Sequence, residues 1–221
     1  MGVRRGSQRV TIEARPGPLT IAPQKTAVIV VDMQNDFGAE NGMFARAGMT
    51  VVYLKMGFAP DLANAGDPGA PNLLRHLALG VGEPVTAPDG RDSRVLIENT
   101  WNTDILPELT PQPGDLIVNK HRYSGFFETE LDAVLKERGI EFLVFTGCTT
   151  SVCVESTLRD AFYRDYRCLL LADCTAEPIG QGLPRANHEA TLLLIELMFG
   201  WVSDSAALEK ALSGQLAAVP S

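Results

Sequence analysis

The hydrophobic positions of this chain form short apolar runs that alternate with amphipathic segments. Continuous runs of apolar, often β-branched residues predict strands that are covered on both faces. We expect such strands at about 26–31, 50–55, 115–119, 142–146, 168–172 and 200–202. Apolar residues spaced three and four apart predict helices. These lie at about 128–138, 152–164, 186–198 and 205–212, with a shorter one near 72–77. The alternation predicts an α/β fold, a three-layer αβα sandwich around a mostly parallel sheet of about six strands.

The domain organisation follows from composition and length. Residues 1–25 are rich in Arg, Gly and Pro, which predicts a loosely ordered N-terminal extension. Residues 26–221 predict a single domain. Within it, residues 56–100 combine many turn formers with weak periodicity, so we expect a long loop region that covers a functional site. The helix at 186–198 is expected to bury Ala190, Leu193, Leu194 and Leu197.

The first crossover of the predicted sheet is unusually short. Residues 33–49 alone connect the first two strands, and they contain glycine and little helical pattern. A parallel crossover usually carries a helix, so roughly 20 residues are missing relative to the usual length. Without a helix in this layer, apolar sheet would be exposed and oligomerisation altered.

Three predicted strands each lead to a residue of catalytic type. Asp32 ends the first strand, Lys120 ends the third, and Cys153 follows the fourth where a helix begins. The carboxyl ends of parallel strands meet at one edge of a sheet, so an acid, an ammonium and a thiol should converge there. The positive end of the helix dipole favours a thiolate at Cys153.

Each of these residues also has an ordinary structural explanation. Asp32 could start a turn, and Lys120 could be a solvated surface lysine. Cys153 could be a small buried residue that fills the strand–helix joint. The occurrence of all three at the same end of the sheet favours the functional interpretation.

Three segments resemble a known family. They are VVDMQNDF at 30–37, Lys-x-x-Tyr-Ser-Gly-Phe-Phe at 120–127 and TGCTTSVCVESTLRDAF at 146–162. Over about 26–212 the chain is similar to the isochorismatase-like cysteine hydrolases. The RYSGFF and FGWVSD segments point to the ureidoacrylate (peroxyureidoacrylate) amidohydrolase branch, which acts in pyrimidine breakdown. The short first crossover departs from the family pattern.

This resemblance implies a mechanism. Asp32, Lys120 and Cys153 would form a catalytic triad, with Cys153 as nucleophile and an acyl-cysteine intermediate. The family also implies a cis peptide bond between Cys148 and Thr149. Backbone N–H groups of Thr149 and Cys153 would hold the oxyanion.

The expected substrate residues are Asn72, Tyr123, Trp101 and Phe37. Asn72 could bind a ureido group, although a loop hydrogen bond explains it equally. The three aromatic residues could line the pocket or pack in the core. Arg122 could meet a substrate carboxylate or form a surface ion pair.

Composition limits the classes of molecule that this chain is expected to bind. The net charge is −8 and no basic stripe appears, which argues against nucleic acid. No apolar run approaches the roughly 18 residues of a membrane span, so we expect no membrane contact and a cytoplasmic location.

Four cysteines do not suggest a disulfide framework. His76, His121 and His188 lack metal-ligand spacing, so neither a metal nor a cofactor is expected, and His188 should be exposed. The expected partners are a small ureido or amide substrate and further copies of the chain.

Several functions are compatible with these features. The leading hypothesis is a cysteine-dependent amidohydrolase that cleaves a C–N bond of a ureido acid. Biuret or an N-carbamoyl amino acid would suit the same triad. Vinyl-ether hydrolysis of the isochorismate type would not need the thiol. A non-catalytic member of the fold remains an alternative because of the short crossover, whereas a flavodoxin-like nucleotide binder lacks its glycine-rich loop.

Overall fold

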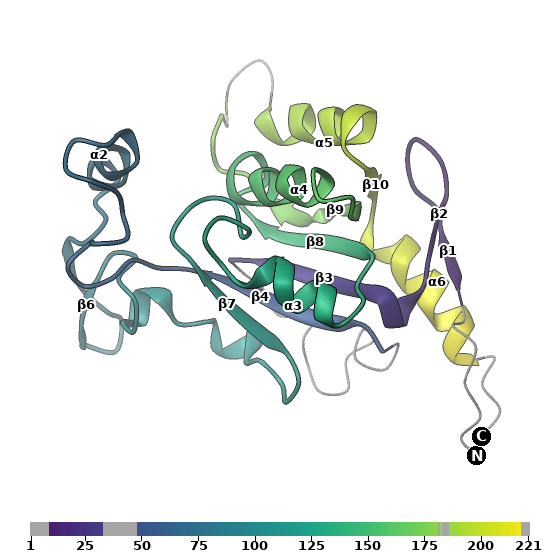
Figure 1. Ribbon diagram of the computed structural model, residues 1–221, viewed down its shortest axis with the longest axis horizontal. Coiled ribbons are helices and arrows are strands. Elements are labelled where there is room, and N and C mark those ends of the chain that lie inside the picture. Colours follow the sequence, from purple (N-terminus) through teal and green to yellow (C-terminus); the bar gives the residue numbers. More distant parts are fainter. Residues whose placement is uncertain (1–8, 33–47, 181, 183–185, 218–221) are drawn as a thin grey trace.

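The protein folds around a six-stranded sheet whose strands all run parallel. The computed structural model describes residues 9–32, 48–180, 182 and 186–217 (Figure 1). The strand order is β10-β9-β8-β3-β4-β7. The strands are β3 (Thr26–Val31), β4 (Thr50–Met56), β7 (Leu116–Lys120), β8 (Phe142–Cys148), β9 (Arg167–Ala176) and β10 (Trp201–Ser203). The predicted α/β sandwich with about six strands is therefore confirmed.

Helices cover both faces of this sheet. They are α3 (Leu131–Glu137), α4 (Glu155–Phe162), α5 (Asn187–Met198) and α6 (Ser205–Ala217), whereas α2 (Pro71–Ala78) lies away from the sheet. From β7 to β10 the chain steps across the sheet in one direction, so right-handed crossovers place α3, α4 and α5 on one face. There Leu131, Leu158 and Ile195 join a core with Ile29 and Phe145. None of the described helices is both long enough and apolar enough to cross a membrane.

The other face is covered by α6 and an N-terminal hairpin. Strands β1 (Val10–Ile12) and β2 (Leu19–Ile21) pair antiparallel, and their four apolar side chains are buried with Leu208 and Leu212 of α6. A short 3-10 helix, Pro23–Lys25, leads from the hairpin into β3. The prediction of a loosely ordered extension is therefore wrong for residues 10–25, because two apolar-Thr-apolar triplets form a half-buried ribbon. The domain boundary at residue 25 stays a prediction.

A small lobe lies beside the carboxyl ends of the strands (Figure 1). It contains α2, the hairpin β5 (Pro84–Thr86) and β6 (Asp92–Arg94), and a 3-10 helix at Trp101–Thr103. The next 3-10 helix, Pro107–Leu109, packs Leu109 into the core beneath the main sheet. The lobe's own core is formed by Phe58, Ala65, Val81 and Ile97. The Gly57 N–H donates to the Lys120 carbonyl at 2.9 Å and fixes the start of the lobe to β7. The predicted long loop region and short helix are confirmed, whereas β5 and β6 were not predicted.

Helix α5 presents an unexpected face to the core. Leu193, Leu194 and Leu197, which the periodicity places inside, are 50%, 38% and 66% exposed. Thr191 and Ile195 are buried instead. The predicted orientation of this helix is therefore wrong, although its bounds agree within a residue. The short crossover between β3 and β4 lies almost entirely outside the described residues.

The chain order creates a switch point between β3 and β8. From β3 the strands proceed outward in both directions, through β4 to β7 and through β8 to β10. Open α/β sheets bind ligands at the carboxyl ends of the two strands where this reversal occurs. Gly147 pairs with Val31 there, at a φ of +107°, and a Cβ on it would lie 1.8 Å from the Val31 carbonyl oxygen. The close approach of β8 to β3 therefore requires glycine.

A Gly147→Ala substitution tests this packing. We expect it to lower the free energy of unfolding by about 3 kcal/mol or more, because the backbone must shift and the φ value is strained. Urea denaturation followed by circular dichroism measures the change. The matched control is Gly214→Ala on α6, where a Cβ meets nothing within 4 Å. It should stabilise by about 0.5–1 kcal/mol. A Gly147→Ala protein of wild-type stability would contradict the argument.

Candidate active site

A buried ion pair joins the ends of β3 and β7. Lys120 Nζ lies 3.0 Å from Asp32 Oδ2, and the lysine side chain is 0% exposed. The ammonium also approaches Met56 Sδ at 3.5 Å and the Arg122 carbonyl at 3.4 Å. Removing such a charge from water costs several kcal/mol unless a counter-charge accompanies it. Lys120 is therefore not the solvated lysine of the alternative explanation.

Asp32 is held at both carboxylate oxygens. Oδ1 accepts the Met56 N–H at 3.2 Å, while Oδ2 faces Lys120. The residue has a φ of +55°, a left-handed conformation that Asp adopts more readily than most residues. Its N–H donates to Leu54 O at 3.2 Å, so the backbone stays tied to β4 while the carboxylate turns toward the lysine.

Cys153 lies in a wide turn between β8 and α4. The turn, Thr150–Val154, is π-helical rather than the plain start of an α-helix that the sequence predicts. Such turns are frequent at functional sites. The charges of Asp32 and Lys120 both act on the Cys153 thiol. The structure thus brings the acid, the ammonium and the thiol together, as the sequence predicts.

The protonation of Cys153 differs from the expectation. The pKa of this thiol is raised to about 11, chiefly by burial, while the Lys120 ammonium opposes the rise and the Asp32 carboxylate adds to it. The expected preference for thiolate in the free protein is therefore wrong, because desolvation outweighs the nearby ammonium. At neutral pH the sulfur carries its proton, and the adjacent Asp32 carboxylate is placed to accept it.

A second thiol belongs to the same surroundings. Cys148 donates a weak hydrogen bond to the Asp32 carbonyl at 3.7 Å. Burial and Asp32 raise its pKa to about 11 as well. Cys148, Cys153 and Cys168 are free thiols.

The peptide bond between Cys148 and Thr149 is cis, as the resemblance implies. The Thr149 carbonyl accepts the N–H groups of Val152 and Val154 at 3.0 and 3.2 Å. The Thr149 N–H itself donates to no other residue in the described part of the chain. The assignment of Thr149 and Cys153 to an oxyanion hole stays a prediction.

The predicted substrate residues are not all brought together. Tyr123 follows Lys120 closely, and its ring packs edge-on against His76 with centroids 5.8 Å apart. Asn72 is exposed in the first turn of α2, and Trp101 is 40% exposed in a 3-10 helix of the lobe. Phe37 lies outside the described residues. Among described residues, no contact joins Asn72 or Trp101 to the triad.

The segment after Lys120 also contains His121 and Arg122, and the sequence left two explanations open for Arg122. His121 Nε2 lies 3.0 Å from Glu128 Oε2. Arg122 Nη1 donates to the carbonyls of Asn64 and His121 at 2.7 and 2.8 Å, and pairs with no described carboxylate. It therefore ties the lobe to the strand end and does not form the surface ion pair considered from sequence.

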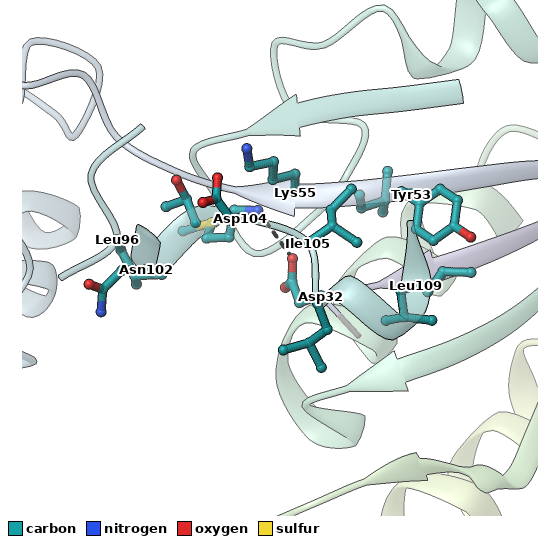
Figure 2. Close-up of a pocket in the computed structure, with 13 residues that line it drawn as sticks. Asp32, Tyr53, Lys55, Leu96, Asn102, Asp104, Ile105 and Leu109 are labelled. Carbon is teal, nitrogen blue, oxygen red and sulfur yellow. Dashed lines mark hydrogen bonds between the residues drawn. The ribbon is translucent and has the colours of Figure 1, made fainter. Parts of the chain in front are cut away.

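A cavity of about 240 Å³ opens on the Asp32 side of the ion pair (Figure 2). Asp32 lies in its wall together with Lys55 of β4, Asn102 of the 3-10 helix and Asp104, which follows that helix. Sequence reasoning missed these three, and the only available signal was that Asn102 adjoins Trp101. Cys153 does not line this cavity. The reacting atoms therefore lie between Asp32, Lys120 and Cys153, at the edge of this cavity and not inside it.

The described side chains form no metal-binding cluster. Within the described residues, no group of three or more His, Cys, Asp or Glu side chains is placed to hold a metal ion. The absence of a metal and of a cofactor stays a prediction.

Comparison with known proteins identifies the family. A model of the isochorismatase domain matches residues 26–207. The chain belongs to the isochorismatase family. It is 42% identical to the ureidoacrylate amidohydrolase RutB of a Methylorubrum extorquens strain, covering 92% of this chain and 89% of that relative. The RutB of Rhizobium rhizogenes is also 42% identical, over 89% of this chain and 87% of its own length.

Solved structures agree with this assignment. A cysteine hydrolase from Pseudomonas syringae pv. phaseolicola has a TM-score of 0.70 at 27% identity, covering 88% of this chain and 95% of that one. An N-carbamoylsarcosine amidase from Thermoplasma acidophilum has a TM-score of 0.58 at 26% identity, covering 82% and 96%. This isochorismatase-family chain therefore has the fold that its motifs imply.

The alignment also bears on the short crossover of this family member. It spans 228 positions with the Methylorubrum relative, whereas 92% of 221 residues is only about 203. Roughly 25 positions therefore have no counterpart in this chain. Their number agrees with the roughly 20 residues missing from the usual crossover length.

Thiol alkylation tests the electrostatics of the site. We expect Asp32→Asn to react faster than wild type with iodoacetamide at Cys153 at pH 8, because removing the carboxylate charge lowers the pKa of the thiol and leaves more thiolate. Lys120→Met should react more slowly for the opposite reason. Peptide mapping by mass spectrometry separates Cys153 from the other cysteines, with Cys153→Ala as blank. Slower alkylation of Asp32→Asn would contradict the conclusion that the Asp32 carboxylate raises the pKa of the Cys153 thiol.

Proposed function

We propose that this protein is a cysteine-dependent amidohydrolase that cleaves a C–N bond of a ureido acid of the ureidoacrylate type. The observation that carries the proposal is the buried Asp32–Lys120 ion pair, both of whose charges act on the Cys153 thiol. The 42% identity to proteins named ureidoacrylate amidohydrolase supports the substrate class.

The proposed reaction begins with a proton transfer. Asp32 takes the thiol proton as the Cys153 sulfur attacks the ureido carbonyl carbon, which forms a tetrahedral intermediate. The N–H groups of Thr149 and Cys153 receive the oxyanion. The C–N bond then breaks, Asp32 returns the proton to the leaving nitrogen, and carbamoyl-cysteine remains. Water attacks this thioester-like carbonyl, carbamate leaves and the thiol regains its proton.

Lys120 has two tasks in this scheme. Its ammonium orients the Asp32 carboxylate at 3.0 Å. It also stabilises negative charge on the sulfur while the proton moves, since it lowers the pKa that burial raises. The thiol must stay reduced for this chemistry, so we propose a cytoplasmic location.

Other carbamoyl substrates form the second candidate. The similarity to an N-carbamoylsarcosine amidase favours an N-carbamoyl amino acid, and the same covalent steps would cleave it. Biuret has the same reacting group. Asn72, Tyr123, Trp101 and Phe37 are proposed to contact the rest of the substrate.

We also propose that the protein forms a homo-oligomer through α5. Leu193, Leu194, Leu197 and Met198 are each at least 38% exposed on this helix. Phe162 and Tyr163 at the end of α4 are also exposed, at 41% and 65%. An apolar patch of this kind on a water-soluble enzyme marks an association surface.

Turnover of ureidoacrylate tests the activity. Release of ammonia or amine from ureidoacrylate, biuret and N-carbamoyl amino acids should identify one preferred substrate. Cys153→Ala should abolish that turnover, a loss of at least about 10³-fold, because the nucleophile is gone. Cys148→Ala serves as the matched thiol control and should remain active. A folded wild-type protein inactive on all these substrates would favour the non-catalytic alternative.

Light scattering after size exclusion tests the α5 surface. Leu193→Glu combined with Leu197→Glu should shift the mass toward the monomer, since two charges cannot be buried in an apolar interface. Leu79→Glu, on the exposed end of α2, is the control. Dissociation by the control variant alone would place the interface on the lobe instead.

A further inference from the structure

Two hydrogen bonds hold the turn of Cys153 from outside the triad. Glu177, in the segment after β9, accepts the Ser151 N–H on Oε2 at 2.8 Å and the Ile179 N–H on Oε1 at 2.8 Å. His188, in the first turn of α5, lies with Nδ1 3.0 Å from the Thr150 hydroxyl. Ser151 and Thr150 are the first residues of the same π-helical turn. The expectation that His188 is merely exposed is therefore wrong.

The inward face of α5 carries polar contacts as well as a buried Ile195. His188, Thr191 and Ile195 share the inward face, and Thr191 donates to Glu155 Oε2 on α4 at 2.8 Å. Hydrogen bonds therefore join the inward face of α5 to the Cys153 turn and to α4.

The position of the Cys153 sulfur depends on this support. Thr150 is 0% exposed, so an unpartnered hydroxyl there would be a buried polar group without a hydrogen bond. The carboxylate of Glu177 joins the turn to the backbone beyond β9. Because the thiol must reach Asp32 and Lys120 together, a displacement of the turn of about 1 Å would cost on the order of 10²-fold in rate.

We infer that Glu177 and His188 are positioning residues that hold the Cys153 turn against the Asp32–Lys120 ion pair. This inference rests on the proposed function, in which Cys153 is the nucleophile. Neither residue touches the reacting atoms. Glu177 fixes the backbone of the turn, and His188 fixes its buried hydroxyl.

Paired variants test the inference. His188→Leu and Glu177→Ala remove the hydrogen bonds, whereas His188→Asn keeps a polar nitrogen near the Nδ1 position and Glu177→Gln keeps one acceptor oxygen. We expect the first pair to lower kcat for ureidoacrylate by about 10- to 100-fold with KM within about twofold. The second pair should recover most of the loss. Glu189→Gln, exposed in the same turn of α5, is the control and should match wild type.

Alkylation provides a readout that needs no substrate. In His188→Leu and Glu177→Ala, the pH profile of iodoacetamide reaction at Cys153 should move toward that of an ordinary thiol, because a displaced sulfur loses both burial and Asp32. If the wild type turns over no ureido substrate, the proposed function fails, and this profile still decides the positioning role.

Thr150→Val keeps the inference testable if the His188 variants do not fold. It removes only the hydroxyl, and it should reproduce the loss of kcat. The double variant Thr150→Val with His188→Leu should lose no more kcat than either single variant, because both substitutions remove the same hydrogen bond. Three outcomes would overturn the inference. They are a wild-type kcat in Thr150→Val and Glu177→Ala, an unchanged alkylation profile in His188→Leu and Glu177→Ala, and losses of kcat in the conservative variants as large as those in His188→Leu and Glu177→Ala.

Discussion

The structure depends on one buried ion pair that spans three strands. Lys120 at the end of the edge strand β7 reaches past the end of β4 to Asp32 at the end of β3. An ammonium in a wholly buried position would be strongly destabilising alone, so the carboxylate must remain beside it. This requirement fixes the direction of both side chains. It also sets the charges that surround the Cys153 sulfur, and so connects the strand order with the protonation of the thiol.

The strands and the triad could be predicted because their signals are local. A run of six residues, five of them apolar, ends at Asp32, and a strand covered on both faces allows few other interpretations. The inward face of α5 could not be predicted in this way. Helical periodicity identifies a leucine face and a His188–Thr191–Ile195 face, and the choice between them depends on hydrogen bonds to Thr150 and Glu155, more than 30 residues earlier.

The lobe shows a second limit of sequence reasoning. Its placement rests on the Gly57 N–H bond to Lys120 and on the Arg122 bonds to Asn64 and His121, none of which has a sequence signature. The triad could therefore be named from motifs, whereas the residues of the lobe that face it could not. The N-terminal hairpin is an intermediate case, since its alternating triplets were visible but are only three residues long.

The protonated resting state of Cys153 has a consequence for chemical durability. Peroxide and other electrophiles attack thiolates far faster than thiols, and oxidation beyond sulfenic acid is irreversible for most proteins. A sulfur that burial and Asp32 keep protonated reacts slowly with peroxide and with other electrophiles. The enzyme would then generate its nucleophile only when a substrate carbonyl is present to receive it, and the same desolvation that slows the free thiol would protect it between turnovers.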